Sequence, residues 1–228
     1  DIHNTQSHTV VTLNNTKNKL ISKIVIVASG FGSPLIKQLG LQTESSDDYL
    51  TASQAEITSN NLERTEVYLG SRIVTGSFGW VVPLADGKAL AGLIGPKVNK
   101  GQMDQFLCLI KSRNKVANIT KDPTSWGVPI KPLSRTYGER ILVAGDATGL
   151  TKPTTGGGIY FSLISGELAA QAASEAIITE DFSTKKMSGY QKNWEAVFGQ
   201  ELTSGHHARL LYQSLKDKQI DQLLDHLW

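Results

Sequence analysis

The residues with the most distinctive chemistry lie between positions 141 and 166, where an acidic residue and a cluster of glycines follow a short apolar run. Asp146 comes just after the apolar residues 141–144, and four glycines and Pro153 lie between positions 149 and 158. So many glycines exclude a regular helix or strand and indicate a loop whose backbone closely approaches a ligand. An acid and a glycine-rich loop in this order are typical of a site that binds the phosphate of a nucleotide. A loop that leads into a core helix without binding a ligand is the alternative.

The elements around this loop are those that would position such a site. Residues 141–144 form an apolar run of the kind found in parallel strands that are covered on both faces. Asp146 is therefore expected at the carboxyl end of a strand, the edge at which open α/β sheets bind their ligands.

A helix is predicted from Ile159 to Ile177, with Ser162, Gly166 and Ala173 among the small residues on the face that packs against the sheet. The glycines at 156–158 are expected to form its first turn, with their amide groups directed toward a negatively charged group.

The order of these residues resembles the second flavin motif of the geranylgeranyl reductase family, which comprises FAD-dependent oxidoreductases of the aromatic-hydroxylase-like fold. The matching stretches are Gly145-Asp146-Ala147-Thr148-Gly149, then Pro153, then Gly156-Gly157-Gly158-Ile159, then Ser165-Gly166. The resemblance implies that Asp146 binds the ribityl hydroxyl groups of FAD and that the amides of 156–159 stabilise the negative charge of reduced flavin. The cofactor-binding residues that it implies here are Gly145, Asp146, Ala147, Pro153, Gly156, Gly157, Gly158 and Ile159.

A second stretch, Ala28-Ser29-Gly30, follows a predicted strand at Ile24–Val27 and precedes a short predicted helix. It resembles the Ala-Asp-Gly-x-x-Ser motif of flavoprotein hydroxylases and reductases, which implies that Ser29 and Gly30 lie near the pyrophosphate of FAD. Ser29 stands where the family usually has Asp. A serine can accept a hydrogen bond but carries no charge, so weaker cofactor binding is expected.

The third stretch, Phe78-Gly79-Trp80-Val81-Val82-Pro83, resembles the aromatic-x-Trp-x-Phe-Pro motif of geranylgeranyl reductases, with Val82 in place of the usual Phe. The resemblance implies that Phe78, Trp80, Val82 and Pro83 line the substrate pocket. An ordinary amphipathic strand with Trp80 in the core explains the same residues equally well. The position of the stretch between the two flavin motifs favours the substrate interpretation.

These motifs predict an α/β (α+β) fold. It comprises an FAD-binding Rossmann-like domain that lacks its first βαβ unit, an inserted antiparallel β-sheet that binds substrate, and a C-terminal helical tail. We expect residues 1–40 and 138–180 in the FAD-binding domain, 41–137 in the β-sheet domain and 181–228 in the tail. No G-x-G-x-x-G follows an early strand and residue 1 is Asp, so we expect an N-terminally truncated fragment.

Other features of the sequence give no reason to expect a nucleic-acid partner, a reactive cysteine, a metal site or a membrane span. The net charge of +2 is too small to indicate a nucleic-acid partner. Cys108 lies among apolar residues and is expected to be a buried structural thiol. The histidines lack nearby cysteines or carboxylates, so no metal site is expected. No apolar run is long enough to span a bilayer, and we expect a cytoplasmic protein, with peripheral membrane contact by the tail helices as an alternative to their packing on the core.

The resemblance implies an FAD-dependent reductase that saturates carbon–carbon double bonds of isoprenoid (geranylgeranyl) groups in lipid or pigment precursors. Its substrate would be an isoprenoid lipid or isoprenyl diphosphate, and NAD(P)H or ferredoxin would donate the electrons. No residue stands out as a proton donor or other catalytic group. Two alternatives remain: an FAD-dependent monooxygenase or halogenase, and an inactive fragment or interaction module.

Overall fold

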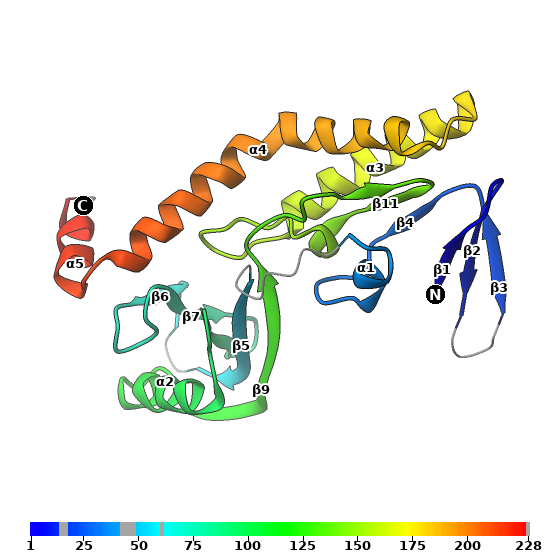
Figure 1. Cartoon of the computed structure of the whole chain (residues 1–228). Helices are drawn as coiled ribbons and strands as arrows, with labels where there is room; N and C mark the ends of the chain where they lie inside the picture. Colours follow the sequence, from blue (N-terminus) through cyan, green and yellow to red (C-terminus); the bar gives the residue numbers. More distant parts are fainter. Residues whose placement is uncertain (14–17, 42–48, 60–61, 227–228) are drawn as a thin grey trace. The chain divides into compact units, whose positions relative to one another are not determined.

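The computed structural model describes residues 1–13, 18–41, 49–59 and 62–226 (Figure 1). The chain forms two compact units, of which the first contains Asp1–Asp48 and Pro129–His207 and the second contains Tyr49–Val128 and Ala208–Trp228. These limits differ from the three segments expected from the sequence, because one long helix, α4 (Thr184–Ser214), contributes to both units. The assignment of one unit to FAD and the other to substrate stays a prediction.

Unit 1 contains two small sheets. One is antiparallel, in the order β1-β2-β3, and the other, in the order β10-β11-β4, pairs β11 with β4 in parallel and with β10 in antiparallel orientation. The parallel pair confirms the buried strand predicted at 141–144. The strands are β1 (Ile2–Asn4), β2 (Thr9–Thr12), β3 (Lys19–Ser22), β4 (Val25–Val27), β10 (Tyr137–Gly138) and β11 (Ile141–Val143).

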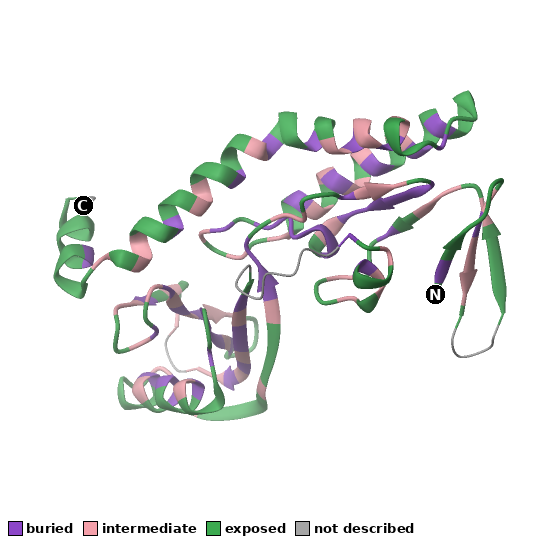
Figure 2. Ribbon diagram, viewed as in Figure 1, coloured by how far each residue is buried: buried purple, intermediate pink, exposed green. Residues whose placement is uncertain are grey.

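The core of unit 1 is built from β11, helix α3 (Ile159–Thr179) and the first half of α4. In α4 the side chains of Tyr190, Trp194 and Phe198 are buried at a spacing of four residues, which places them on one face of the helix. Figure 2 shows buried positions recurring along this long helix, in purple, between exposed ones. Val197, three residues after Trp194, has the spacing of the same face but is 54% exposed.

The small-residue face of α3 is displaced from the predicted one. Its buried residues include Ser165, Ala169 and Ala173, whereas Ser162 and Gly166 are only partly buried. The reason is that Phe161 packs into the core at the start of the helix, and positions four residues apart from it therefore share its face.

Unit 2 is organised around a five-stranded sheet in the order β6-β7-β8-β5-β9, and the pairs β6–β7, β7–β8 and β5–β8 are antiparallel. Helix α2 (Lys100–Ser112) covers one face, where alternate strand residues such as Val81, Ala91 and Leu93 pack against Met103 and Phe106. The antiparallel sheet predicted for this part of the chain is confirmed. The strands are β5 (Tyr49–Thr58), β6 (Glu66–Leu69), β7 (Phe78–Pro83), β8 (Lys88–Gly95) and β9 (Asn118–Pro129).

The apolar pattern of the sequence favours a helix from Met103 to Asn118, but α2 ends at Ser112, because Asn114 has a φ of 60° and the chain then enters β9. The prediction of a buried Cys108 is also wrong. Cys108 is exposed, because the buried residues of α2 fall at 103, 106, 107 and 110 and leave position 108 on the other side of the helix. The short predicted helix after Ser33 is present as α1 (Pro34–Gln38), and α5 (Asp217–Asp225) ends the described chain.

Candidate cofactor and substrate sites

The two flavin-like motifs leave the same edge of a sheet in unit 1. Strands β4 and β11 run parallel with Val27 opposite Val143, and the amide of Ala144 donates to the carbonyl of Val27 at 3.0 Å. The stretch Ser29-Gly30 and the stretch Gly145-Asp146 therefore begin side by side at the carboxyl ends of these strands. The sequence predicted a strand before each stretch, and the parallel pairing adds that the two stretches are neighbours at the edge where such sheets bind ligands.

The backbone around Asp146 is fixed by a short 3-10 turn, η1 (Gly145–Thr148). The amide of Gly145 donates to Ser165 Oγ at 3.0 Å, and Thr148 Oγ1 donates to the carbonyl of Gly145 at 2.6 Å. Gly145 has a φ of 66°, a conformation that favours glycine. The turn is thus tied to α3 through Ser165, while the Asp146 side chain is exposed.

The Asp146 carboxylate lies beside the first residues of α3. Ser162 Oγ donates to Asp146 Oδ1 at 3.4 Å, and a Cβ atom added at Gly158 would lie 2.5 Å from the same oxygen. Gly158 is the N-cap residue of α3. A glycine is therefore required at 158 for the carboxylate to keep its position.

The start of α3 supplies free amide donors next to this carboxylate. Within the described chain, no side chain caps the helix, and Ile159, Tyr160 and Phe161 occupy the first turn, where amides have no acceptor inside the helix. Uncapped amides at the positive end of a helix favour a polar or anionic group.

Apolar side chains surround the same helix start. Ile159 is 80% exposed, Tyr160 56% and Leu163 69%. A ligand with both polar and apolar parts matches this combination of amides, carboxylate and apolar side chains.

The glycines at 156–158 lie in a loop turn and not in the helix. The amide of Gly156 donates to the carbonyl of Lys152 at 2.8 Å, and the carbonyl of Gly157 accepts from the amide of Lys152 at 2.9 Å. The prediction that 156–158 form the first helical turn is therefore wrong, because Gly156 closes a turn within the loop and the helix begins at Ile159.

Two further predicted cofactor residues are engaged in packing. Ala147 is 6% exposed and belongs to the cluster around Ile141 and Val143. Pro153 is buried next to α4, where a Cβ at Gly205 would lie 3.2 Å from its Cδ. These residues shape the loop around Asp146.

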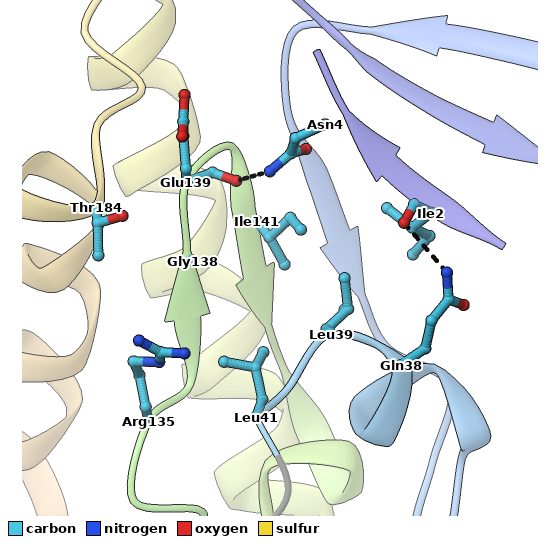
Figure 3. A pocket seen from close by; sticks show the side chains of 10 residues that line it. All are labelled: Ile2, Asn4, Gln38, Leu39, Leu41, Arg135, Gly138, Glu139, Ile141 and Thr184. Atoms are coloured by element: carbon cyan, nitrogen blue, oxygen red, sulfur yellow. Dashed lines mark hydrogen bonds between the residues drawn. The ribbon is translucent and has the colours of Figure 1, made fainter. Parts of the chain in front are cut away.

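A cavity of about 310 Å³ lies near the start of β11, at the end of the strand away from Asp146 (Figure 3). Asn4 Nδ2 donates to the carbonyl of Glu139 at 2.6 Å and Gln38 Nε2 to that of Ile2 at 3.2 Å on its walls. Arg135 also lines the cavity. The side chains of Asn4 and Gln38 bind backbone carbonyls and so link β1, α1 and the β10–β11 turn. We therefore interpret the cavity as a packing feature of the junction between these elements.

The predicted substrate residues lie in unit 2. Phe78, Trp80 and Val82 are half-buried on the face of the sheet opposite α2, and Trp80 is not a member of the core cluster on the α2 side. Trp80 Nε1 donates to Gln54 Oε1 at 3.2 Å, and the rings of Phe78 and Trp80 are 6.0 Å apart.

Glycine 92 makes room for the indole of Trp80. Gly92 is paired with Trp80 on one side and with Gln54 on the other, and a Cβ added there would collide with the Trp80 ring. The contribution of Gln54 could not be found in the sequence, because the pairing of two strands far apart in the chain brings it to Trp80. In the sequence Ser162 was visible only as a small residue of the helix and Ser165 only as part of the flavin-like motif; their hydrogen bonds to Asp146 and Gly145 come from the fold.

Two classes of feature are not found in the described part of the chain. No helix there is long and apolar enough to cross a membrane. No three His, Cys, Asp or Glu side chains come together there as a group that could hold a metal ion.

Comparison with known proteins extends these observations. No family model matches the chain. Over 216 residues it is 30% identical to digeranylgeranylglycerophospholipid reductase of Methanosarcina acetivorans, covering 90% of this chain and 53% of that protein. A solved structure of a geranylgeranyl bacteriochlorophyll reductase-like protein from Thermoplasma acidophilum superposes with a TM-score of 0.89 at 26% identity, covering 98% of this chain and 59% of that one.

A more distant likeness links the chain to the flavin-dependent halogenase CmlS, with a TM-score of 0.66 at 16% identity over 88% of this chain and 40% of that one. The fold is thus one that flavin-dependent enzymes use. Within it, the chain is a relative of the geranylgeranyl reductases, which confirms the resemblance seen in the sequence. The chain spans about half the length of the curated relatives it matches.

Proposed function

We propose that this chain is part of an FAD-dependent reductase that saturates carbon–carbon double bonds of isoprenoid groups in lipid or pigment precursors. The observation that carries the proposal is the meeting of Ser29-Gly30 and Gly145-Asp146 at one sheet edge, beside the uncapped start of α3. The relatives named as digeranylgeranylglycerophospholipid reductases support the same activity. The halogenase likeness supports only the fold.

The residues of unit 1 fit FAD in their chemistry. Asp146 would accept hydrogen bonds from the ribityl hydroxyl groups, and the amides of Ile159 and the next residues would bind the polar edge of the flavin ring. Gly158 leaves room for the carboxylate, and Ile159 and Leu163 would contact apolar parts of the cofactor.

When bound, FAD would supply a hydride for one alkene carbon, and a proton would be added to the other. The contribution of the chain is to hold the cofactor and to place the alkene, for which we propose the half-buried residues Phe78, Trp80, Val82 and Pro83 of β7. NAD(P)H or ferredoxin is proposed as the electron donor.

The proposal is tested by flavin binding. The natural protein that contains this chain is purified, its flavin absorbance is recorded, and FAD is titrated into the apoprotein and into an Asp146→Ala variant. Loss of one charge-assisted hydrogen-bond acceptor is expected to weaken FAD binding by about tenfold or more. Asp104→Ala, which removes an exposed aspartate of α2, is the matched control and should bind FAD normally. Failure of the natural protein to bind FAD would contradict the proposal.

A further inference from the structure

The face of the unit 2 sheet opposite α2 carries an apolar strip that ends in a polar cluster. Side chains alternate along a strand, so the neighbours of the core residues Val81 and Ala91 point away from α2. The pairing places them in successive rows: Trp80 with Gly92 and Gln54, then Val82 with Leu90 and Glu56, then Lys88 with Thr58. We call this set of residues the Trp80 face.

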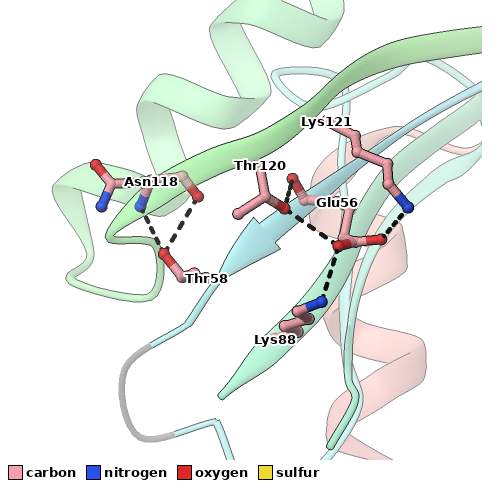
Figure 4. A network of polar contacts seen from close by, with 6 residues as sticks. All are labelled: Glu56, Thr58, Lys88, Asn118, Thr120 and Lys121. Carbon is pink, nitrogen blue, oxygen red and sulfur yellow. Dashed lines mark hydrogen bonds and ion pairs between the residues drawn. The ribbon is translucent and has the colours of Figure 1, made fainter. Parts of the chain in front are cut away.

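At the polar end of the Trp80 face, Lys88 and the neighbouring Lys121 of β9 both approach the Glu56 carboxylate (Figure 4). Lys121 Nζ lies 2.9 Å from Glu56 Oε2 and Lys88 Nζ lies 3.6 Å from Glu56 Oε1. Thr120 Oγ1 donates to the backbone carbonyl of Glu56 at 3.0 Å and approaches Oε1 at 3.3 Å.

This cluster carries a net positive charge. The hydrogen bond from Lys121 lowers the pKa of Glu56, which therefore stays ionised at neutral pH. In the part of the chain that the structure describes, Glu56 is the single carboxylate paired with these two lysines. The Glu56 side chain is 16% exposed, whereas those of Lys88 and Lys121 are 52% and 74% exposed, so both ammonium groups can reach a ligand.

We infer that Lys88 and Lys121 bind the phosphate group of an isoprenyl phosphate whose hydrocarbon chain lies along Val82, Leu90 and Trp80. The inference rests on the proposed function and adds to it the position of the headgroup and the requirement for a phosphate. Two ammonium groups on one carboxylate leave one positive charge to be balanced, and lysine is a common phosphate ligand. The apolar residues next to them match a hydrocarbon chain.

The spacing of the rows sets the length of the ligand. Gly92, the partner of Trp80, lies four positions after Lys88 in β8, which corresponds to about 13 Å along the strand. A phosphate held by the lysines therefore requires several isoprene units for its chain to reach the Trp80 ring. A single isoprene unit would end near Val82 and Leu90.

The test compares farnesyl monophosphate with farnesol, which has the same hydrocarbon chain but no phosphate. Binding to the natural protein is measured by calorimetry at two salt concentrations. The phosphate compound should bind at least tenfold more tightly than the alcohol, and this preference should shrink at higher salt. In a Lys88→Gln/Lys121→Gln variant the preference should be lost. Lys97→Gln, which removes an exposed lysine of the same unit outside the cluster, is the matched control and should keep it.

A variant that should strengthen phosphate binding complements the lysine variants, which should weaken it. Glu56→Gln removes the carboxylate that competes with the phosphate for both ammonium groups, so it should strengthen binding of farnesyl monophosphate several-fold and leave farnesol binding unchanged. Thermal unfolding checks that each variant is folded, and the single lysine variants replace the double variant if it is not.

The outcomes separate this inference from the proposed function. Equal binding of farnesyl monophosphate and farnesol, or a preference that survives loss of both lysines, overturns the inference even if the protein binds FAD and reduces isoprenoids. Absence of FAD binding overturns the proposed function, whereas a phosphate preference that depends on Lys88 and Lys121 would still support a lipid phosphate site on this face.

Discussion

Replacing Gly158 by alanine should separate cofactor binding from folding. The added Cβ would lie 2.5 Å from Asp146 Oδ1 and 3.3 Å from its Cγ, whereas an ordinary contact begins near 3.4 Å. The carboxylate must therefore move away by about 0.9 Å, the difference between the ordinary contact and the distance that the alanine would impose. Because Asp146 is exposed and its side chain can rotate, the movement costs little folding energy.

The same substitution has a small favourable effect on folding. Gly158 has a φ of −105° and a ψ of −19°, a conformation that alanine adopts without strain. The loss of backbone freedom in the unfolded chain then contributes about 0.4–1 kcal/mol of stability, which offsets the displaced carboxylate. We expect the free energy of unfolding to change by less than about 1 kcal/mol.

Cofactor binding should change far more. A hydrogen bond to a charged group contributes about 1.5–3 kcal/mol, so misplacing the Asp146 carboxylate should weaken FAD binding by about tenfold or more. The assay is an FAD titration followed by flavin fluorescence, together with urea unfolding of the same samples. Gly189→Ala is the matched control, because it lies in a helix, meets no atom within 4 Å and should leave FAD affinity unchanged. A folded Gly158→Ala protein with normal FAD affinity would refute this role of Asp146.

Three further predictions concern stability. Gly92→Ala should destabilise unit 2 by about 1–3 kcal/mol and alter the fluorescence of Trp80, because the new methyl group collides with the indole ring and the neighbouring strand; a normal thermal unfolding curve would contradict this. Tyr190→Phe should lower the free energy of unfolding in urea by about 1 kcal/mol or more, because the buried hydroxyl donates to the carbonyl of Val143 in β11 at 2.7 Å. Tyr160→Phe, at an exposed position, is the control and should change it by nothing measurable. Burial, followed by the hydrogen bond to Glu66, raises the pKa of Tyr68 from 10.0 to about 12. The neutral hydroxyl therefore contributes stability that is complete below pH 10 and is lost as the pH rises toward 12. If a Tyr68→Phe variant loses stability over the same pH range to the same extent, another group is responsible.

The parts of the fold that follow local rules could be predicted from the sequence. The apolar run at 141–144 predicted a parallel strand. The pair Asp86-Gly87 between two β-prone runs is likewise a local hairpin signal, and it forms the β7–β8 turn, with Asp86 at a φ of 58°. The position of Asp146 at a strand end followed from the same reasoning. These features depend on residues close together in the chain.

The parts that depend on tertiary contacts could not be predicted. Helix α3 was expected to begin with its glycines, but packing of Phe161 sets which face is buried and the helix begins at Ile159. Asp217 and Ser214 both have the residue type of a helix cap, but the Asp217 carboxylate accepts hydrogen bonds from the amide and hydroxyl of Ser71, 146 residues away in the chain. A carboxylate can be satisfied equally well by capping its own helix or by binding a distant amide and hydroxyl. The residue type alone therefore does not predict which of the two it does.

Continuity of α4 through both units is another feature without a local signal. The tail was predicted to be helical, and it is, yet the 31 residues of α4 contribute buried aromatic residues to unit 1 and Arg209 to unit 2. The helical period continues without a break through both segments, so the sequence does not mark where one unit ends.

The most direct test of the central claim is the mass of the isoprenoid product. The natural protein is incubated anaerobically with FAD, dithionite as a chemical reductant and a geranylgeranyl compound, and the lipid is analysed by mass spectrometry. The proposed reductase predicts a gain of two hydrogen atoms for each double bond reduced, with much slower product formation in Asp146→Ala. An unchanged lipid mass in a protein that binds FAD and is reduced by dithionite would contradict the claim.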